Sequence, residues 1–272
     1  METTLQIAPE EGPGSPPRLG RWLLAAVLFI MYLPMQVLLA VPAVVFAMST
    51  GEITSMDDLL ESETVLWLTL GAAALAAALT IAAAAVWPRL WKLFTSRLYS
   101  LNEWLAWRAP RRLPLWAVPL LTFPVLIVVG LLVALLFGPT EIDIQLQLFS
   151  TPALGAASAV IVSTVVPVAE ELIFRGALYN ALLPRGGEAG GWQSHALPFV
   201  VSTILFAGVH LLAGFETAAA IVQVIILSAY LTSLRTFTGS VKASVAGHLV
   251  WNFIAAVGLM VSTLIDLPGI TS

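Results

Sequence analysis

Residues 152–183 read PALGAASAVIVSTVVPVAEELIFRGALYNALL. The stretch is as apolar as a membrane-spanning helix up to Ala169, then meets Glu170, Glu171 and Arg175, and continues in a helix-compatible pattern to its end. Ionisable groups inside a membrane helix cost several kcal/mol unless they are partnered, so they usually mark function. The stretch therefore predicts a membrane helix that carries a functional polar group.

The composition of the whole chain is that of an integral membrane protein. Of its 272 residues, 59% are hydrophobic and only 10% are charged, whereas a soluble domain carries about 25% charged residues. The net charge of -4 leaves no broad basic face for nucleic acid. Because the chain has no cysteine, disulfides, thiolate nucleophiles and Cys-ligated metals are excluded.

The apolar runs predict an all-α, polytopic transmembrane helix bundle of about seven spans, because about 20 apolar residues cross a bilayer. The expected spans are residues 22–48, 65–87, 115–137, 152–183, 197–213, 217–234 and 243–265. Between the second and third spans, Leu90 to Trp107 carries apolar and basic residues at helical spacing, so we expect an interfacial amphipathic helix there.

The charged residues between the spans predict the topology, because cytoplasmic loops collect Lys and Arg. Eleven of the twelve Lys and Arg fall on one side of the expected bundle, which makes the N terminus cytoplasmic and the C terminus external. The opposite loops contain Glu52, Asp57, Asp58, Glu61, Glu63, Glu141, Asp143, Glu216 and Asp266, and no Lys or Arg. We expect residues 1–20, rich in Pro, to be a disordered cytoplasmic tail, residues 21–137 to hold the first three spans and the interfacial helix, and residues 152–265 to form the remaining bundle.

Three polar clusters interrupt the late spans, namely Glu170, Glu171 and Arg175, then Phe206 and His210, then His248 and Asn252. Glu171 and Arg175 are spaced for an ion pair on one helix face. Glu170 points about 100° away from its neighbour, so it needs a partner on another helix. His210 and His248 are the candidates, whereas His195, at the end of the expected loop 185–194, is not favoured.

This set of side chains supports more than one chemistry. A buried carboxylate can act as a general base for water, and an imidazole and a carboxamide can stabilise a developing oxyanion, which suits amide hydrolysis. The same groups could form a proton relay. The chain contains no His-Glu-x-x-His pair, no Asp within a span and no Gly-x-Ser-x-Gly, which argues against other intramembrane hydrolases. Structural readings also remain open: an ion pair for Glu171 and Arg175, and packing for Phe206.

The three clusters, in this order on successive spans, resemble the motifs of the CPBP family, also called the type II CAAX prenyl endopeptidase or Abi family. The resemblance covers residues 152–265. It implies an intramembrane endopeptidase in which Glu170, with His210, activates water. It further implies that His248 and Asn252 stabilise the oxyanion, and that Glu171, Arg175 and Phe206 support the site.

The family resemblance leaves the cofactor open. Members are commonly classed as metalloproteases, and Glu170, His210 and His248 could hold Zn²⁺ with a water molecule in the fourth position. Equally, Glu170 and His210 could activate water without a metal. The partners implied are membrane lipid and a membrane-associated peptide or protein substrate, in a bacterial inner membrane. The alternatives are a non-catalytic immunity or scaffold protein and a proton-coupled transporter.

Overall fold

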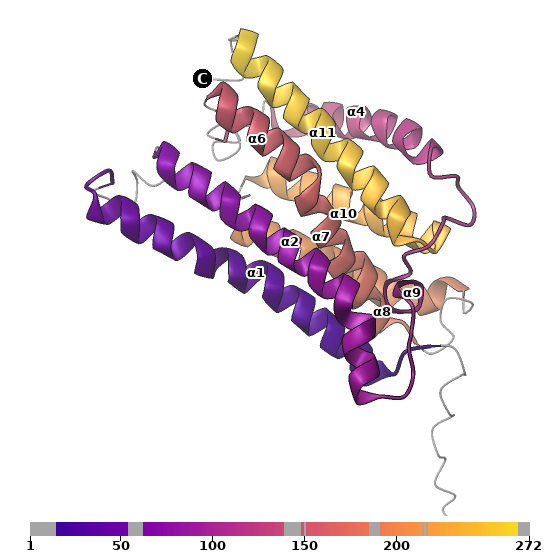
Figure 1. The fold of residues 1–272 in the computed structure, drawn as a ribbon. Helices are drawn as coiled ribbons and strands as arrows, with labels where there is room; N and C mark the ends of the chain where they lie inside the picture. Colours follow the sequence, from indigo (N-terminus) through magenta and orange to yellow (C-terminus); the bar gives the residue numbers. More distant parts are fainter. Residues whose placement is uncertain are drawn as a thin grey trace, which may run out of the picture.

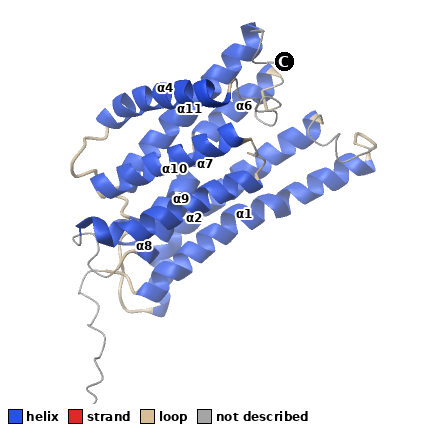
Figure 2. Cartoon of the chain, turned by 180° about the vertical axis from the view of Figure 1, so that it is seen from behind, coloured by secondary structure: helices blue, strands red, loops and turns tan. Residues whose placement is uncertain are grey.

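The computed structural model describes residues 15–53, 62–138, 148–149, 151–184, 191–213, 215 and 217–265. Within these ranges the chain forms helices and no strand, and the helices pack into an elongated bundle (Figures 1 and 2). Seven helical segments are long and apolar enough to cross a membrane. They are α1 (Arg18–Ser49), α2 (Glu63–Phe94), α4 (Ala117–Phe137), the run from α6 to α8 (Pro152–Leu182), α9 (Gly191–Leu212), α10 (Ala218–Thr238) and α11 (Val241–Ile265). The predicted all-α, seven-span fold is confirmed.

The fourth span is not one regular helix. It consists of α6 (Pro152–Ser163), α7 (Val165–Glu171), the π-helical segment η2 (Leu172–Leu178) and α8 (Tyr179–Leu182). The break falls at Thr164, whose backbone is not helical. Pro167 explains it, because a proline has no N–H to bond the carbonyl four residues earlier and its ring clashes with that carbonyl. The π-helical turn directly follows the two glutamates, a placement that is frequent at functional sites.

The fourth span lies between two groups of helices (Figure 1). On one side α7 contacts α2 and η2 contacts α1, while on the other α6 and α7 contact α11. The largest buried apolar cluster includes Leu28 of α1, Ala77 of α2 and Phe174 of η2. A second cluster joins α4, α10 and α11. The polar residues of the fourth span are therefore enclosed by protein on both sides.

Local sequence explains where several helices begin and end. Ser62 starts α2 by accepting a hydrogen bond from the N–H of Val65 at 3.1 Å, and Thr217 starts α10 in the same way through the N–H of Ala220. Such caps satisfy N–H groups that have no partner inside the helix. Helix α10 ends at Gly239, whose φ of 66° is the left-handed conformation that glycine adopts without strain.

The predicted interfacial helix over Leu90–Trp107 is wrong in form. Helix α2 continues through Pro88 to Phe94, and a capping box at Ser100 starts the short helix α3 (Leu101–Leu105). Trp104 then packs its ring 5.5 Å from that of Trp91 and is 1% exposed. The segment breaks and folds back onto the bundle because burying this aromatic cluster stabilises it more than lying flat on a membrane surface would.

Two other boundaries differ from expectation. Helix α1 begins at Arg18, inside the segment expected to be a tail, because Pro17 is well suited to precede a helix and residues from Arg18 onward carry no further proline until Pro34. Residues 1–14 lie outside the described residues. Helix α9 begins at Gly191 and runs unbroken through Pro198, so His195 belongs to a helix and not to a loop.

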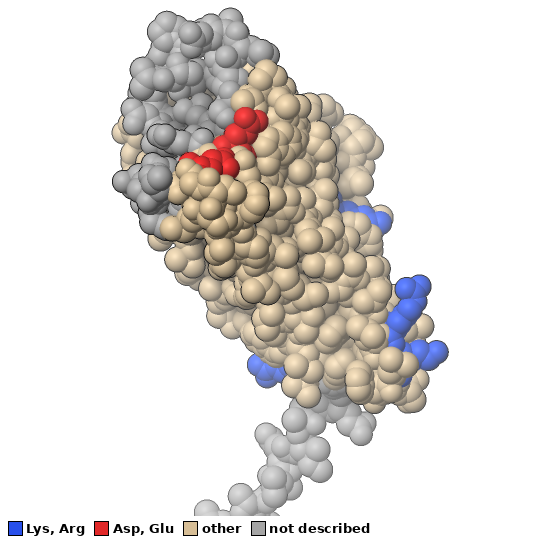
Figure 3. All heavy atoms as spheres, turned by 60° about the vertical axis from the view of Figure 1, so that its left-hand side comes forward, with Lys and Arg blue, Asp and Glu red and all other residues tan. Residues whose placement is uncertain are grey.

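Charged side chains lie at opposite ends of the bundle. One end of the bundle is formed by the start of α1, the end of α2, residues 95–116, the end of α10 and the start of α11. We call it the basic end. On the face shown in Figure 3, acidic side chains lie at one end and most Lys and Arg toward the other. Of the expected external acids, Glu52 and Glu63 are described, and the others lie outside the described residues, as does Arg185. The cytoplasmic N terminus remains a prediction.

Candidate active site

The ion pair that the spacing predicts is present at the junction of α7 and η2. Arg175 donates from Nη1 to Oε1 of Glu171 at 2.8 Å, and both side chains are fully buried. The guanidinium also donates to the carbonyl and hydroxyl oxygens of Ser228, at 3.0 and 2.7 Å, and to the hydroxyl of Thr232 at 3.3 Å. Both residues belong to α10. Arg175 therefore ties the fourth span to the sixth.

His248 lies between the two adjacent glutamates. Its Nδ1 contacts Oε1 of Glu171 at 2.9 Å, and its Nε2 lies 3.7 Å from Oε2 of Glu170. An ionised carboxylate can only accept, so Nδ1 carries the proton in the bond to Glu171. The distance from Nε2 to Glu170 exceeds a hydrogen bond of about 2.7–3.2 Å. Glu171 therefore fixes the ring and directs its Nε2 toward Glu170.

Glu170 has a partner that the sequence did not indicate. The hydroxyl of Tyr32, in α1, donates to Oε1 of Glu170 at 2.9 Å. The other carboxylate oxygen, Oε2, faces His248. Glu170 is 7% exposed, compared with 0% for Glu171. The two oxygens of Glu170 are thus distinct, because one is held by α1 and the other faces an imidazole.

His210, in the last turn of α9, lies close to the same group. Its Nδ1 contacts the carbonyl oxygen of Phe206 at 2.9 Å. A carbonyl can only accept, so Nδ1 carries the proton and the neutral ring keeps its lone pair on Nε2. Glu170, His248 and Arg175 are all near enough to interact electrostatically with His210. The ring is therefore fixed with Nε2 available as a base or ligand.

Phe206 occupies the centre of this group. Its ring centroid lies 4.3 Å from that of His210 and 5.8 Å from that of His248, and the guanidinium carbon of Arg175 lies 4.4 Å from the same centroid. The ring is fully buried. One phenyl ring thus packs against both imidazoles and the arginine, which fits the packing role expected for it.

Asn252 lies one turn beyond His248 on α11. Its Nδ2 donates to the carbonyl oxygen of Val162 at 2.9 Å, next to the break at Thr164. A regular helix would use that carbonyl for its own hydrogen bond, so Asn252 satisfies a group freed by the break. The contact uses one of the two protons of the amide, and the other is available for a different acceptor.

The described residues do not form a metal site. No three His, Asp or Glu side chains among them are grouped in a way that could hold a metal ion. In particular, Glu170, His210 and His248 do not form the expected zinc ligand set. The arrangement of the described residues therefore does not fit the metal alternative.

Sequence reasoning missed Tyr32, Ser228 and Thr232. Tyr32 offered a detectable pattern, because it is one of only four tyrosines and its hydroxyl falls in the middle of an apolar span. A phenol hydroxyl in that position needs a hydrogen-bond partner, which could have directed attention to it. Ser228 and Thr232 offered little, since Ser and Thr are common in membrane helices, where they bond their own backbone.

The fold and this buried glutamate, histidine and arginine group define a multi-pass helical membrane protein with a polar site inside its bundle. A family model described as Type II CAAX prenyl endopeptidase Rce1-like matches residues 152–254. The chain therefore carries a domain of this family, which confirms the resemblance, and the matched residues include all three motifs. Comparisons with curated proteins and with solved structures found no match.

Proposed function

We propose that the protein is an intramembrane endopeptidase that cleaves a membrane-associated, CAAX-like substrate with a water molecule activated by Glu170 and His210. The observation that carries the proposal is the meeting of Glu170 and His248 from separate helices, with Nε2 and Oε2 3.7 Å apart. The family match over residues 152–254 supports it. The excess of Lys and Arg at the basic end supports a cytoplasmic N terminus. The membrane proposed is a bacterial inner membrane.

The proposed reaction assigns a role to each hydrogen-bonding group of the site. Glu170 takes a proton from water, whose second proton is held by the Nε2 lone pair of His210, and the resulting hydroxide attacks the peptide carbonyl carbon. Asn252 and His248 stabilise the oxyanion that forms. The proton on Glu170 passes to the leaving amine as the carbon–nitrogen bond breaks. Tyr32 and Glu171 act as positioning residues, through Glu170 and His248 respectively.

Cleavage of a fluorogenic peptide with a C-terminal prenylated cysteine segment, by the full chain in proteoliposomes, tests the proposal. We expect Glu170→Gln to lower the rate by about 10²- to 10⁴-fold, the usual contribution of a general base. Glu63→Gln, at an exposed position in the first turn of α2, is the matched control and should leave the rate unchanged.

Two results would contradict the proposal. If Glu170→Gln cleaves as fast as the wild type, Glu170 is not the base. If the wild type cleaves no such peptide and Glu170→Gln lowers only thermal stability, the network has a structural role and the scaffold alternative is favoured. pH-driven flux across the same vesicles would instead favour the transporter.

A further inference from the structure

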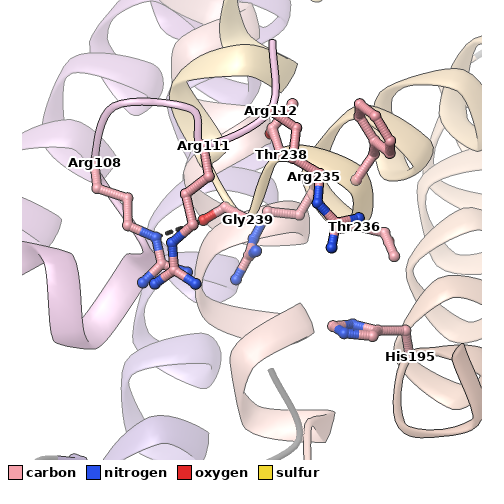
Figure 4. A pocket seen from close by; sticks show the side chains of 9 residues that line it. Arg108, Arg111, Arg112, His195, Arg235, Thr236, Thr238 and Gly239 are labelled. Atoms are coloured by element: carbon pink, nitrogen blue, oxygen red, sulfur yellow. Dashed lines mark hydrogen bonds between the residues drawn. The ribbon is translucent and has the colours of Figure 1, made fainter. Parts of the chain in front are cut away.

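A second group of ionisable side chains lies at the basic end, apart from the candidate active site. Arg108, Arg111, Arg112, Arg235 and His195 line a cavity of about 60 Å³, and the last turn of α10 completes its wall (Figure 4). That space is enough for a few water molecules or one small anion. In Figure 4 the side chains of Arg108 and Arg111 extend in the same direction, and His195 lies on the other side of the cavity.

The loop between α3 and α4 brings three of these arginines to the end of α10. The N–H of Arg111 donates to the carbonyl oxygen of Thr238 at 3.1 Å, and Nε of Arg108 donates to the carbonyl oxygen of Gly239 at 2.8 Å. Helix α10 ends at this glycine. Residues far apart in sequence are therefore held together by hydrogen bonds to the backbone of α10 and Gly239, so the cavity is a built feature of the fold.

The contacts of two of the arginines orient them without removing their charge. Arg235 is fully buried, donates to the carbonyl oxygen of Arg175 and to Oδ1 of Asn180, and lies 5.0 Å over the ring of Tyr179. The guanidinium of Arg112 lies 5.4 Å over the ring of Phe237. Among the described residues that line the cavity there is no Asp or Glu. The cavity therefore concentrates positive charge.

The surroundings of the cavity place it at the level of a membrane surface. Arg111 and Arg112 are exposed, and beside them in the chain Trp116 is 71% exposed, while Phe237 on the cavity wall is 53% exposed. Arginine next to exposed aromatic surface is typical of the boundary between headgroups and acyl chains. A ligand here can hold its charge in the cavity and lay its apolar part along the adjoining surface.

We propose that this cavity binds the phosphate group of an anionic phospholipid. Guanidinium groups bind phosphate through paired, charge-assisted hydrogen bonds, and basic pockets between membrane helices are a known setting for lipid headgroups. A cavity of about 60 Å³ admits the phosphate but not an acyl chain. The site is distinct from Glu170 and its neighbours and does not depend on peptidase activity. Free inorganic phosphate shares the same chemistry, so the test separates the two sources.

Native mass spectrometry of the full chain, released from nanodiscs that contain equal phosphatidylglycerol and phosphatidylcholine, tests the proposal. We expect the wild type to retain phosphatidylglycerol at least about fivefold over phosphatidylcholine. Arg111→Ala/Arg112→Ala should remove that preference, because it deletes two charges of the cavity at exposed positions that should not affect folding. Arg89→Ala/Lys92→Ala, at exposed positions of α2, deletes the same charge at the same end and should keep it.

Each outcome decides the question. Loss of selectivity only in the Arg111 and Arg112 variant supports a lipid site, and competition by millimolar inorganic phosphate would show that the phosphate group is what is recognised. Protection of the wild type against heating by inorganic phosphate, without lipid selectivity, would assign the cavity to free phosphate and overturn the lipid. Equal loss of lipid selectivity in both double variants would overturn the site. A wild type that shows neither lipid selectivity nor protection by inorganic phosphate would also overturn it.

Discussion

Glu170 and Glu171 are neighbours in the chain, yet their carboxylates contact different parts of the molecule. Glu171 is fully buried, and its Oε1 contacts Arg175 and His248, both within residues 152–254. Glu170 is slightly exposed, is held at one oxygen by Tyr32 from α1, and faces His248 with the other. A rotation of about 100° along one helix separates a carboxylate that organises the site from one that can reach a further group.

Removing the partner of the organising carboxylate should have the largest effect on stability. Arg175→Met leaves Glu171 buried without its arginine, and breaking a buried ion pair in this way costs about 3–5 kcal/mol. We expect a marked fall in the temperature at which the purified protein unfolds in detergent. Glu171→Gln/Arg175→Met should be less destabilised than the single variant, because it leaves no unpaired charge. Equal stability of Arg175→Met and wild type would show that the pair contributes nothing.

Removing the partner of the reactive carboxylate should affect activity more than folding. Tyr32→Phe keeps the ring and deletes one hydrogen bond, which costs about 1.5–3 kcal/mol when one partner is charged. If half of that cost reaches the transition state, cleavage slows by about 4- to 13-fold. The pH dependence of the rate should shift as well, since Tyr32 donates to Glu170, whereas a merely structural tyrosine would leave it unmoved.

Tyr99→Phe provides the control for this comparison. Tyr99 is also a buried tyrosine and packs its ring 5.7 Å from that of Trp104. We expect the Tyr99→Phe variant to cleave the peptide at the wild-type rate, with an unchanged pH profile. A rate for Tyr32→Phe equal to that of Tyr99→Phe would mean that α1 does not contribute to the site.

Glu52 is an exposed carboxylate at the end of the bundle opposite the basic end. It serves as a reference, and its substitution should give the smallest effect. A hydrogen bond from Ser62, joined by one from Thr64, holds the pKa of Glu52 below its usual value of 4.5. Because the pKa of Glu52 is lower in the folded state than in the unfolded state, its ionised form stabilises the folded state at higher pH. This stabilisation is lost as the pH falls through the folded-state pKa. Wild type should therefore unfold about 1 °C or less above Glu52→Gln at pH 7.

At low pH, wild type and Glu52→Gln should have the same unfolding temperature. Thermal unfolding measured from about pH 6 down to about pH 3 follows the change, because Glu52 becomes protonated and then resembles glutamine. A difference that grows as the pH falls would contradict the lowered pKa.

Much of the fold and part of the site could be predicted from sequence because they depend on local periodicity. A membrane span needs only a long apolar run, and an ion pair at Glu171 and Arg175 needs only a spacing of four residues. Contacts between distant elements follow no such spacing. Nothing in the sequence around Glu170 indicates that Tyr32, more than a hundred residues earlier, would donate to it.

The errors have the same origin. Leu90–Trp107 has the periodicity of an interfacial helix, but burial of Trp104 against Trp91 outweighs that pattern and breaks the segment. Helix α9 begins at Gly191 and continues through Pro198, although the apolar run that predicted this span begins only at residue 197.

The π-helical segment Leu172–Leu178 also governs the far end of its own span. A wider turn takes about one more residue than an α-helical one, so everything after it is shifted in phase by about 100°. Tyr179 and Asn180, which hold Arg235 beside the arginine cavity, lie beyond that shift, whereas Glu170 and Glu171 lie before it. Deleting one of residues 176–178 from this turn would leave each motif intact in sequence, yet the two polar layers of the protein could no longer both face inward.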